Sequence, residues 1–524
     1  MKRRKPIRRA LALGLFLLCL GCGFASAQAA AQKPASTRKA ASDKASPLSK
    51  AQAALAKGDL QGAEDGAWQV LAASPDNEDG LTLLGIIRGQ QQRYAEAETL
   101  FAKVVKLNPT SPAARQNLAN ALLAQDKVEE AVAQYKEAES RAPKSVEIKV
   151  NLARLYSDRG KFDLALSTLQ SIPTSAFPPA AVPVEAASLI GLGREGEAAG
   201  LAGKVANSLP LTMELAEVFL RGNLADAALR TLKSVATTKG LPARYYYLEG
   251  QALLSKAQGE DAEAALRHAL ELDPKSVETL VALAEISAMK RQHDESVKFL
   301  QQAHELAPDA IPLLRHLVIE SEAAGLASAA ARAARELAQK SPDNLDDLYL
   351  ASAAMLQGGD TVDALAALKS YTAQRSDDPN GWLALGMACL TQKRYDDARS
   401  ALERSAQLAP NRAETEYQLG VLAVEESKRD EGIEHFEKAL RIDPKHAASL
   451  AKLGGLYLQS GDLDKAQQAL TQSLAVAPNV PDTEYKLAMT LSKMGKTAEA
   501  REHMQRFQKL KQSLEAKTQG DPAR

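Results

Sequence analysis

Prolines recur every 34 residues along most of the chain. They fall into three trios: Pro75, Pro109 and Pro143; Pro274, Pro308 and Pro342; Pro410, Pro444 and Pro478. A fixed period of this length indicates stacked units, each of which buries its apolar face only against its neighbours. The spacing falls to 32 between Pro178, Pro210, Pro242 and Pro274, and a three-residue insertion is expected at Asp377 to Pro379. The period predicts about fourteen units.

Each unit carries a second, more specific pattern of small and large residues. One unit shows it as Leu453, Gly454, Tyr457, Gly461, Ala466, Leu470 and Pro478, and another as Leu385, Gly386, Tyr395, Ala398, Leu402 and Pro410. Small residues let two helices approach closely, and large residues fill the grooves between them. Glycine near the middle, as at Gly58, Gly160, Gly325 and Gly461, ends a first helix in a left-handed conformation. Proline ends the second helix. No useful run of strand-like alternation occurs, so we predict an all-α fold.

These residues resemble the tetratricopeptide repeat family over roughly residues 44–512. The resemblance implies an α-solenoid, a right-handed superhelix of tandem helix pairs, whose concave surface is lined by the first helix of each pair. We expect regular units over residues 44–178 and 243–512, and degenerate units over 179–242, where prolines crowd the chain. A polar tail is expected over residues 513–524.

The amino terminus resembles an export signal of bacterial type. Six basic residues precede an apolar run from Ala10 to Leu20, which is too short to span a bilayer. Small residues favour cleavage after Ala27, giving a signal peptide over residues 1–27. Alternatively, Cys22 ends a sequence similar to a lipoprotein signal and would carry a lipid anchor, although Cys19 departs from that pattern. Residues 28–43 have the composition of a flexible tether. We therefore expect a periplasmic protein, or one on the periplasmic face of the outer membrane, with no membrane contact except a lipid at Cys22.

Charge and cysteine content narrow the possible functions. From residue 51 onward the chain has 54 basic and 64 acidic residues, so it lacks the positive surface that nucleic-acid binding requires. Outside the signal the only cysteine is Cys389, so no intramolecular disulfide is expected, and we predict that Cys389 lies in the core.

Sequences that look enzymatic have simpler explanations. Gly191 to Gly196 matches a dinucleotide-binding pattern, but it follows a predicted helix rather than a strand. Gly495-Lys496-Thr497 lacks the first glycine of a phosphate-binding loop. The seven histidines have no metal-ligand spacing, and we expect most of them on solvated helix faces. We therefore predict no catalytic residues, no metal and no cofactor.

Two groups of first-helix residues are candidates for contact with a protein or peptide partner. The amides and guanidinium of the third and fourth units can pair with a peptide backbone: Gln116, Asn117, Asn120, Asn151 and Arg154. The last units offer aromatic area beside lysines, which select acidic partners: Tyr417, Gln418, Lys452, Tyr485 and Lys486, with Met489. For both groups a purely structural role is the alternative.

Three functions follow from this sequence. The first is a non-enzymatic binding scaffold or assembly factor of the bacterial cell envelope. The second is an accessory protein for polysaccharide export or carbohydrate binding, which the 4% aromatic content disfavours. The third is an enzyme whose site is assembled across units and is invisible in the sequence.

Overall fold

The structure is a computed structural model, and it describes residues 46–205 and 208–519. Over these ranges the chain consists of helices and turns without a strand, which confirms the predicted all-α class. The signal, the tether and the residues Cys22 and Ala27 lie outside the described residues. The last helix continues to Gln519, through much of the segment expected as a polar tail.

The chain divides into two compact units, each of which contains several of the repeated helix pairs. We name them unit 1 (residues 1–265) and unit 2 (residues 266–524). Unit 1 contains α2 (Pro47–Ala56), α3 (Leu60–Ala73), α4 (Glu78–Gln90), α5 (Tyr94–Leu107), α6 (Pro112–Ala124), α7 (Val128–Arg141), α8 (Val146–Asp158), α9 (Phe162–Gln170), η1 (Thr174–Ala176), η2 (Pro179–Ala181), α10 (Val182–Gly191), α11 (Glu195–Ala199), α12 (Leu209–Arg221), α13 (Ala225–Lys233) and α14 (Ala243–Ser255). Helix α15 (Gly259–Leu272) spans the boundary between the units.

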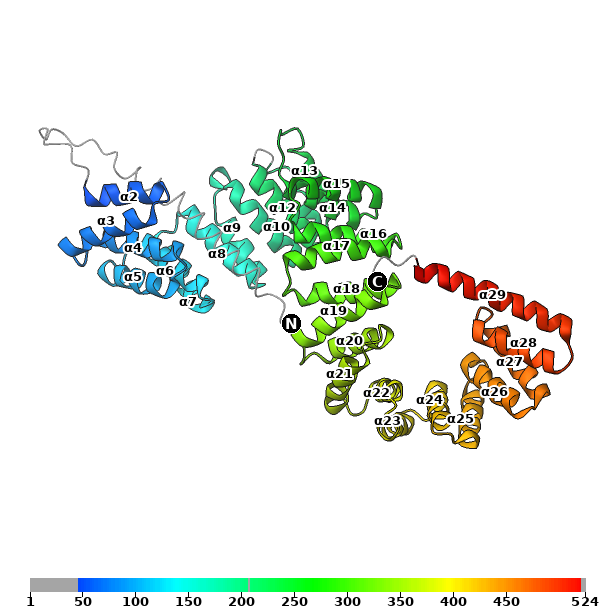
Figure 1. Ribbon diagram of the computed structural model, residues 1–524. Coiled ribbons are helices and arrows are strands. Elements are labelled where there is room, and N and C mark those ends of the chain that lie inside the picture. The colour runs from blue at the N-terminus through cyan, green and yellow to red at the C-terminus, as the bar shows by residue number, and fades with distance from the viewer. Residues whose placement is uncertain (1–45, 206–207, 520–524) are drawn as a thin grey trace, which may run out of the picture. The chain divides into compact units, whose positions relative to one another are not determined.

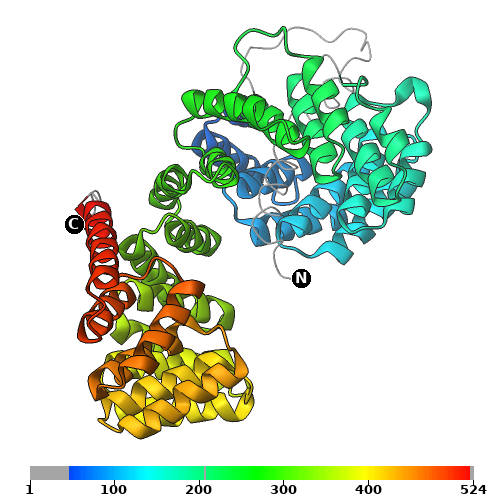
Figure 2. The same cartoon turned by 90° about the vertical axis from the view of Figure 1, so that its right-hand side faces the viewer.

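Unit 2 continues with the same alternation of helices. It contains α16 (Val277–Met289), α17 (His293–Leu306), α18 (Ile311–Ala323), α19 (Ala327–Lys340), α20 (Leu345–Gln357), α21 (Thr361–Gln374), α22 (Pro379–Thr391), α23 (Tyr395–Leu408), α24 (Ala413–Glu425), α25 (Arg429–Ile442), α26 (Ala447–Ser460), α27 (Leu463–Val476), α28 (Pro481–Lys493) and α29 (Thr497–Gln519). Consecutive helices pack on one another, and the yellow and orange helices α24 to α27 lie side by side in Figure 2.

First helices often start three residues after the proline that closes the preceding pair. A serine or asparagine then accepts a hydrogen bond from a free backbone N–H of the first turn, as Asn77 Oδ1 does from the Gly80 N–H at 2.8 Å. Ser111, Ser145 and Ser276 cap their helices in the same way. Such a cap stabilises a helix by about 1 kcal/mol, so the start of each of these capped pairs is fixed locally.

The two helices of each pair are joined by a turn in which one residue has a positive φ. This residue occurs fourteen times in the described chain: at Gly58, Gln92, Asp126, Gly160, Gly193, Asn223, Ala257, Arg291, Gly325, Gly359, Lys393, Ser427, Gly461 and Gly495. Its φ lies between 56° at Lys393 and 85° at Gly359, which is the left-handed region. The structure confirms the predicted left-handed glycines and shows that other residues adopt the same conformation in half of the turns.

These turn residues locate the irregularities of the array. Their spacing is 34 residues except from Gly160 to Gly193, where it is 33, and from Gly193 to Asn223, where it is 30. Within the segment expected to be degenerate, the second helices α11 and α13 are shortened to 5 and 9 residues, while the first helices α10 and α12 persist and contact each other. The second helices therefore lose most length, although α10 is also shorter than α12, with 10 residues against 13, and the two first helices remain in contact.

The insertion expected at Asp377 to Pro379 does not exist. Helices α20 and α22 each have 13 residues, and their first residues, Leu345 and Pro379, are 34 residues apart. Pro379 occupies the first turn of α22, where a proline needs no N–H, instead of ending the helix before it. The prediction was wrong because it assigned every proline to the same place in the repeat.

Glycines of the first helix lie directly against a large residue sixteen positions later in the second helix. A methyl group added at Gly420 would lie 2.7 Å from Cε1 of Phe436 and 3.1 Å from the carbonyl oxygen of Gly432. Gly85 meets Phe101 in the same way, as do Gly386 with Leu402 and Gly454 with Leu470. Phe436 and Leu470 are fully buried, which confirms that small residues allow large ones to close the seam between two helices.

We expect Gly420→Leu to destabilise the protein by about 1–3 kcal/mol, because the added side chain displaces the Phe436 ring. Leu419→Ala should cost about 2–5 kcal/mol through the cavity that it leaves. The control is Gly455→Ala, whose methyl would lie 3.5 Å from Lys486, an ordinary contact, and should raise stability by about 0.5–1 kcal/mol. Chemical denaturation followed by circular dichroism measures all three, and a silent Gly420→Leu contradicts the seam.

A second prediction concerns the left-handed turns. Ala257 has a φ of 58°, a conformation that costs a residue with a Cβ about 1–2 kcal/mol, so Ala257→Gly should stabilise the chain by roughly 0.5–1 kcal/mol. The same substitution at Ala264, exposed within helix α15, should instead cost about 1 kcal/mol. Chemical denaturation measures the free energy of unfolding of both variants. If the two alanine-to-glycine changes shift it in the same direction, the left-handed turn does not have the role given to it here.

Candidate partner-binding surface

The first helices of neighbouring pairs contact one another along the array. Such contacts join α18 to α20, α20 to α22, α22 to α24 and α26 to α28. Figure 1 shows α22 and α24 on the inner side of the bend of unit 2, with α23 and α25 on its outer side. At these pairs the inner face of unit 2 is therefore built from residues of first helices. Both candidate sites were predicted on first helices, one site in unit 1 and the other in unit 2.

The structure gives different environments to the amides predicted in unit 1. Gln116 is buried and donates to Glu147 on the next first helix at 2.6 Å. Asn120 is also buried, and its side-chain oxygen accepts a hydrogen bond from the Tyr135 hydroxyl. Both amides thus join helices to one another.

The other three predicted residues of unit 1 remain partly accessible. Asn117, Asn151 and Arg154 are half-buried, and Arg154 forms an ion pair of 2.9 Å with Glu214 on α12. The Nδ2 atom of Asn151 is buried and has no hydrogen-bond partner, although buried amide donors usually have one. Asn151 is therefore the predicted residue of this group with unused hydrogen-bonding capacity.

The predicted patch in the last units presents lysines and aromatic rings at its surface. Lys452 is exposed, and Lys486 pairs with Asp482 of its own helix at 2.6 Å. The Tyr485 side chain is 41% exposed, and its ring packs on Phe507 with a centroid distance of 5.3 Å.

The remaining members of this patch are more enclosed. Tyr417 is half-buried against Phe436 and His446, and burial raises the pKa of its hydroxyl. Gln418 donates to Glu414 at 2.7 Å. Tyr417 therefore acts mainly as packing, whereas Lys452 and Tyr485 offer surface to a partner.

Histidine placement differs from the prediction. Five of the seven histidines are half-buried and contact a glutamate on another helix: His293 with Glu320, His304 with Glu336, His435 with Glu416, His446 with Glu414, and His503 with Glu484. The hydrogen bond from His435 is the main cause that lowers the pKa of Glu416. The sequence concealed these pairs because the partner lies in another helix, 19 to 32 residues away.

The enzyme-like motifs lie in turns between helices. Gly191 ends α10, Gly193 is the left-handed turn residue, and Glu195 begins α11. Gly495 occupies the same place between α28 and α29. No group of three potential metal ligands occurs among the described residues. Cys389 is 1% exposed, as predicted for a core residue, and burial raises the pKa of its thiol.

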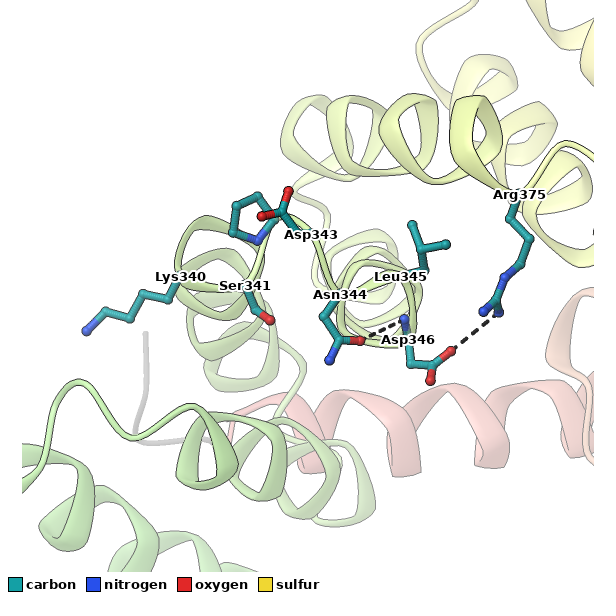
Figure 3. A pocket seen from close by; sticks show the side chains of 8 residues that line it. Lys340, Ser341, Asp343, Asn344, Leu345, Asp346 and Arg375 are labelled. Atoms are coloured by element: carbon teal, nitrogen blue, oxygen red, sulfur yellow. Dashed lines mark hydrogen bonds and ion pairs between the residues drawn. The ribbon is translucent and has the colours of Figure 1, made fainter. Parts of the chain in front are cut away.

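A shallow polar cavity of about 500 Å³ lies where α19 meets α20. Eight residues line the cavity (Figure 3): Lys340, Ser341, Pro342, Asp343, Asn344, Leu345, Asp346 and Arg375. Arg375 contacts Asp346 at 3.4 Å across the opening, while Asn344 caps α20. Its residues are thus already occupied in capping a helix and in an ion pair.

In the part of the chain that the structure describes, no helix combines the length and the apolar character needed to cross a bilayer.

Stacked helix pairs with a shared inner face define an α-helical repeat protein. Models of the tetratricopeptide repeat match residues 48–112, 82–146, 122–182, 247–311, 423–488 and 482–510, which together make up more than half of the chain. The chain belongs to the tetratricopeptide repeat family. A model of the anaphase-promoting complex, cyclosome, subunit 3, also matches residues 324–405.

Solved structures similar to this chain have low sequence identity to it. The APC/C hetero-tetramer Cut9-Hcn1 is 18% identical, with a TM-score of 0.41, over 88% of this chain and 93% of that one. YrrB, described as a TPR protein with an unusual peptide-binding site, is 19% identical, with a TM-score of 0.31, over 36% of this chain and 97% of its own. A tetratricopeptide repeat protein from Parabacteroides merdae is 18% identical, with a TM-score of 0.38, over 46% and 97%. No curated protein matches this sequence.

Proposed function

We propose that this chain is a non-enzymatic scaffold of the bacterial cell envelope, which binds segments of partner proteins on the inner face of its first helices. The main support is that these helices contact one another in series and present residues of the same helical positions to solvent. Such a surface can hold an extended length of another molecule without any reaction chemistry.

The positive charges on the last helix pairs of unit 2 indicate which partners this surface would favour. Lys452 and Lys486 occupy equivalent positions on adjacent first helices, and the Lys486 side chain lies 3.5 Å from where a Cβ at Gly455 would be. Two lysines on neighbouring helices, beside the exposed Tyr485 ring, favour an acidic segment that also offers apolar contact.

The envelope location rests on the amino-terminal sequence. The basic segment and the run from Ala10 to Leu20 support export, and the small residues before Gln28 support cleavage. Cys22 supports attachment to a lipid as the second possibility.

Crosslinking in the native cell envelope tests the scaffold role. We expect the double variant Lys452→Glu, Lys486→Glu to lose crosslinked partners that the wild-type chain captures, because the reversed charges repel acidic segments. The matched control is Lys438→Glu with Lys445→Glu, which changes the net charge equally at exposed sites outside the first helices. An identical partner set for all three proteins would contradict binding at this patch.

Detergent partitioning tests how the chain is retained in the envelope. If Cys22 carries a lipid, wild-type protein enters the detergent phase and Cys22→Ala moves to the aqueous phase. If cleavage follows Ala27, both proteins stay in the aqueous phase, and the mature chain begins at Gln28 by mass spectrometry.

A further inference from the structure

One position of the first helix differs in character between the two units. It is the sixth residue before each left-handed turn residue. In unit 1 it is mostly polar: Gln52, Ile86, Asn120, Arg154, Ala187, Glu217 and Gln251. In unit 2, after Glu285, it is apolar in every pair: Ile319, Ala353, Met387, Val421, Gly455 and Met489.

These residues of unit 2, which we name the apolar stripe, are accessible to solvent. Ile319 is 48% exposed, Met387 37% and Met489 36%, while Ala353, Val421 and Gly455 are half-buried. A Cβ at Gly455 would face Lys486 of the next first helix, so this position points along the row of first helices. Half-buried Leu350 and Ala384 extend the apolar surface between these residues.

The middle of the stripe lies among helices without any basic residue. Helices α20, α22 and α24 contain no lysine, arginine or histidine, and their charged residues are Asp346, Asp347, Glu414, Glu416 and Glu425. Arg315 pairs with buried Asp347, and His435 pairs with Glu416. Of the other three, Asp346 contacts Arg375 at 3.4 Å, Glu414 contacts His446 at 3.2 Å, and Glu425 is exposed. Counting Arg315, Arg375 and Arg412, which precedes α24, against these five carboxylates leaves an excess of two negative charges, and this excess favours a partner with positive charge.

Backbone chemistry decides which kind of partner fits this surface. An extended peptide on the stripe would bury N–H and C=O groups against Ala353, Met387 and Val421, which offer no side-chain hydrogen-bonding group. A helix satisfies its backbone internally and needs only an apolar face. The axes of neighbouring packed helices lie about 8–10 Å apart. Two turns of a bound helix span roughly 11 Å, so apolar residues that recur every seven positions in that helix can contact successive first helices of this chain.

We propose that the inner face of unit 2 binds an amphipathic α-helix, whose apolar side covers the apolar stripe from Ile319 to Val421, before the lysines of α26 and α28, and whose flanks are basic. This inference rests on the proposed scaffold function and assigns to unit 2 a class of partner that the polar inner face of unit 1 does not fit. The methionine side chain at Met387 adapts to different apolar faces, so the site accepts a class of helices rather than one sequence.

The test uses the full chain and a fluorescent peptide of about 28 residues, with leucines in heptad positions and lysines on the opposite face. Fluorescence anisotropy at physiological salt should show binding, and Met387→Glu should weaken it at least tenfold. The added carboxylate would strengthen a purely electrostatic contact with the basic peptide, so a loss reports apolar docking. Val421→Glu, one pair further along, should have the same effect.

The matched control is Val362→Glu on α21. Val362 is 69% exposed on a second helix, so this change should leave peptide affinity unaltered. Circular dichroism and thermal melts confirm that each variant folds. A peptide of the same composition with two central prolines cannot form a continuous helix and should bind at least tenfold more weakly.

Three results would overturn the inference. The first is that both Met387→Glu and Val421→Glu bind the peptide as tightly as the wild-type chain does. The second is that the proline peptide binds as tightly as the helical peptide. The third is that the wild-type chain self-associates in sedimentation and that Met387→Glu abolishes this association. The last would mean that a second copy covers the stripe. If these variants change nothing while Lys452→Glu with Lys486→Glu alters the envelope partners, the helix site fails and the scaffold function stands. If peptide binding responds as expected but no variant alters the partners, the scaffold function fails instead.

Discussion

Every helix pair depends on a chain reversal in which one residue takes a positive φ. Six residues before it, the first helix presents a side chain on the inner face. Seven residues before it, a small residue such as Gly420 or Gly454 meets the large residue of the second helix. The turn therefore fixes both the register of the two helices and the direction of the inner side chains. Because this turn recurs at nearly constant spacing, the inner side chains of successive pairs within each unit fall in equivalent places and form one surface.

Turns and seams were predictable from the sequence to different degrees. The glycine seams were evident, since the spacing of Gly420 to Phe436 matches the two-helix pattern. The turns were only half visible, because Gln92, Ala257 and Lys393 adopt a conformation that the sequence signals reliably only through glycine. Prolines were misleading where one began a helix, as Pro379 does, instead of ending one.

The candidate site was harder to predict than the fold for a related reason. Helical position indicates which face a residue occupies, but the neighbour across the interface comes from another helix. Gln116 and Asn120 were correctly placed on first helices, yet Glu147 and Tyr135 engage them. The histidines were misplaced because their glutamates lie on other helices. Contacts between helices therefore decide which polar residues remain accessible, and a single sequence does not show those contacts.

The two units combine one backbone plan with two different inner chemistries. Unit 1 presents partly accessible amides and charges, such as Asn117, Asn151 and Arg154, and such groups suit hydrogen bonding to an extended or polar segment. Unit 2 presents Met387 and Val421 on helices that contain no basic residue.

Burying apolar surface gives affinity with little directional demand, whereas the small excess of negative charge disfavours helices with acidic flanks. A scaffold that carries both kinds of surface can hold two partners of different character at once. Tandem repeats allow this because the inner side chains change without disturbing the seams that hold the helices together.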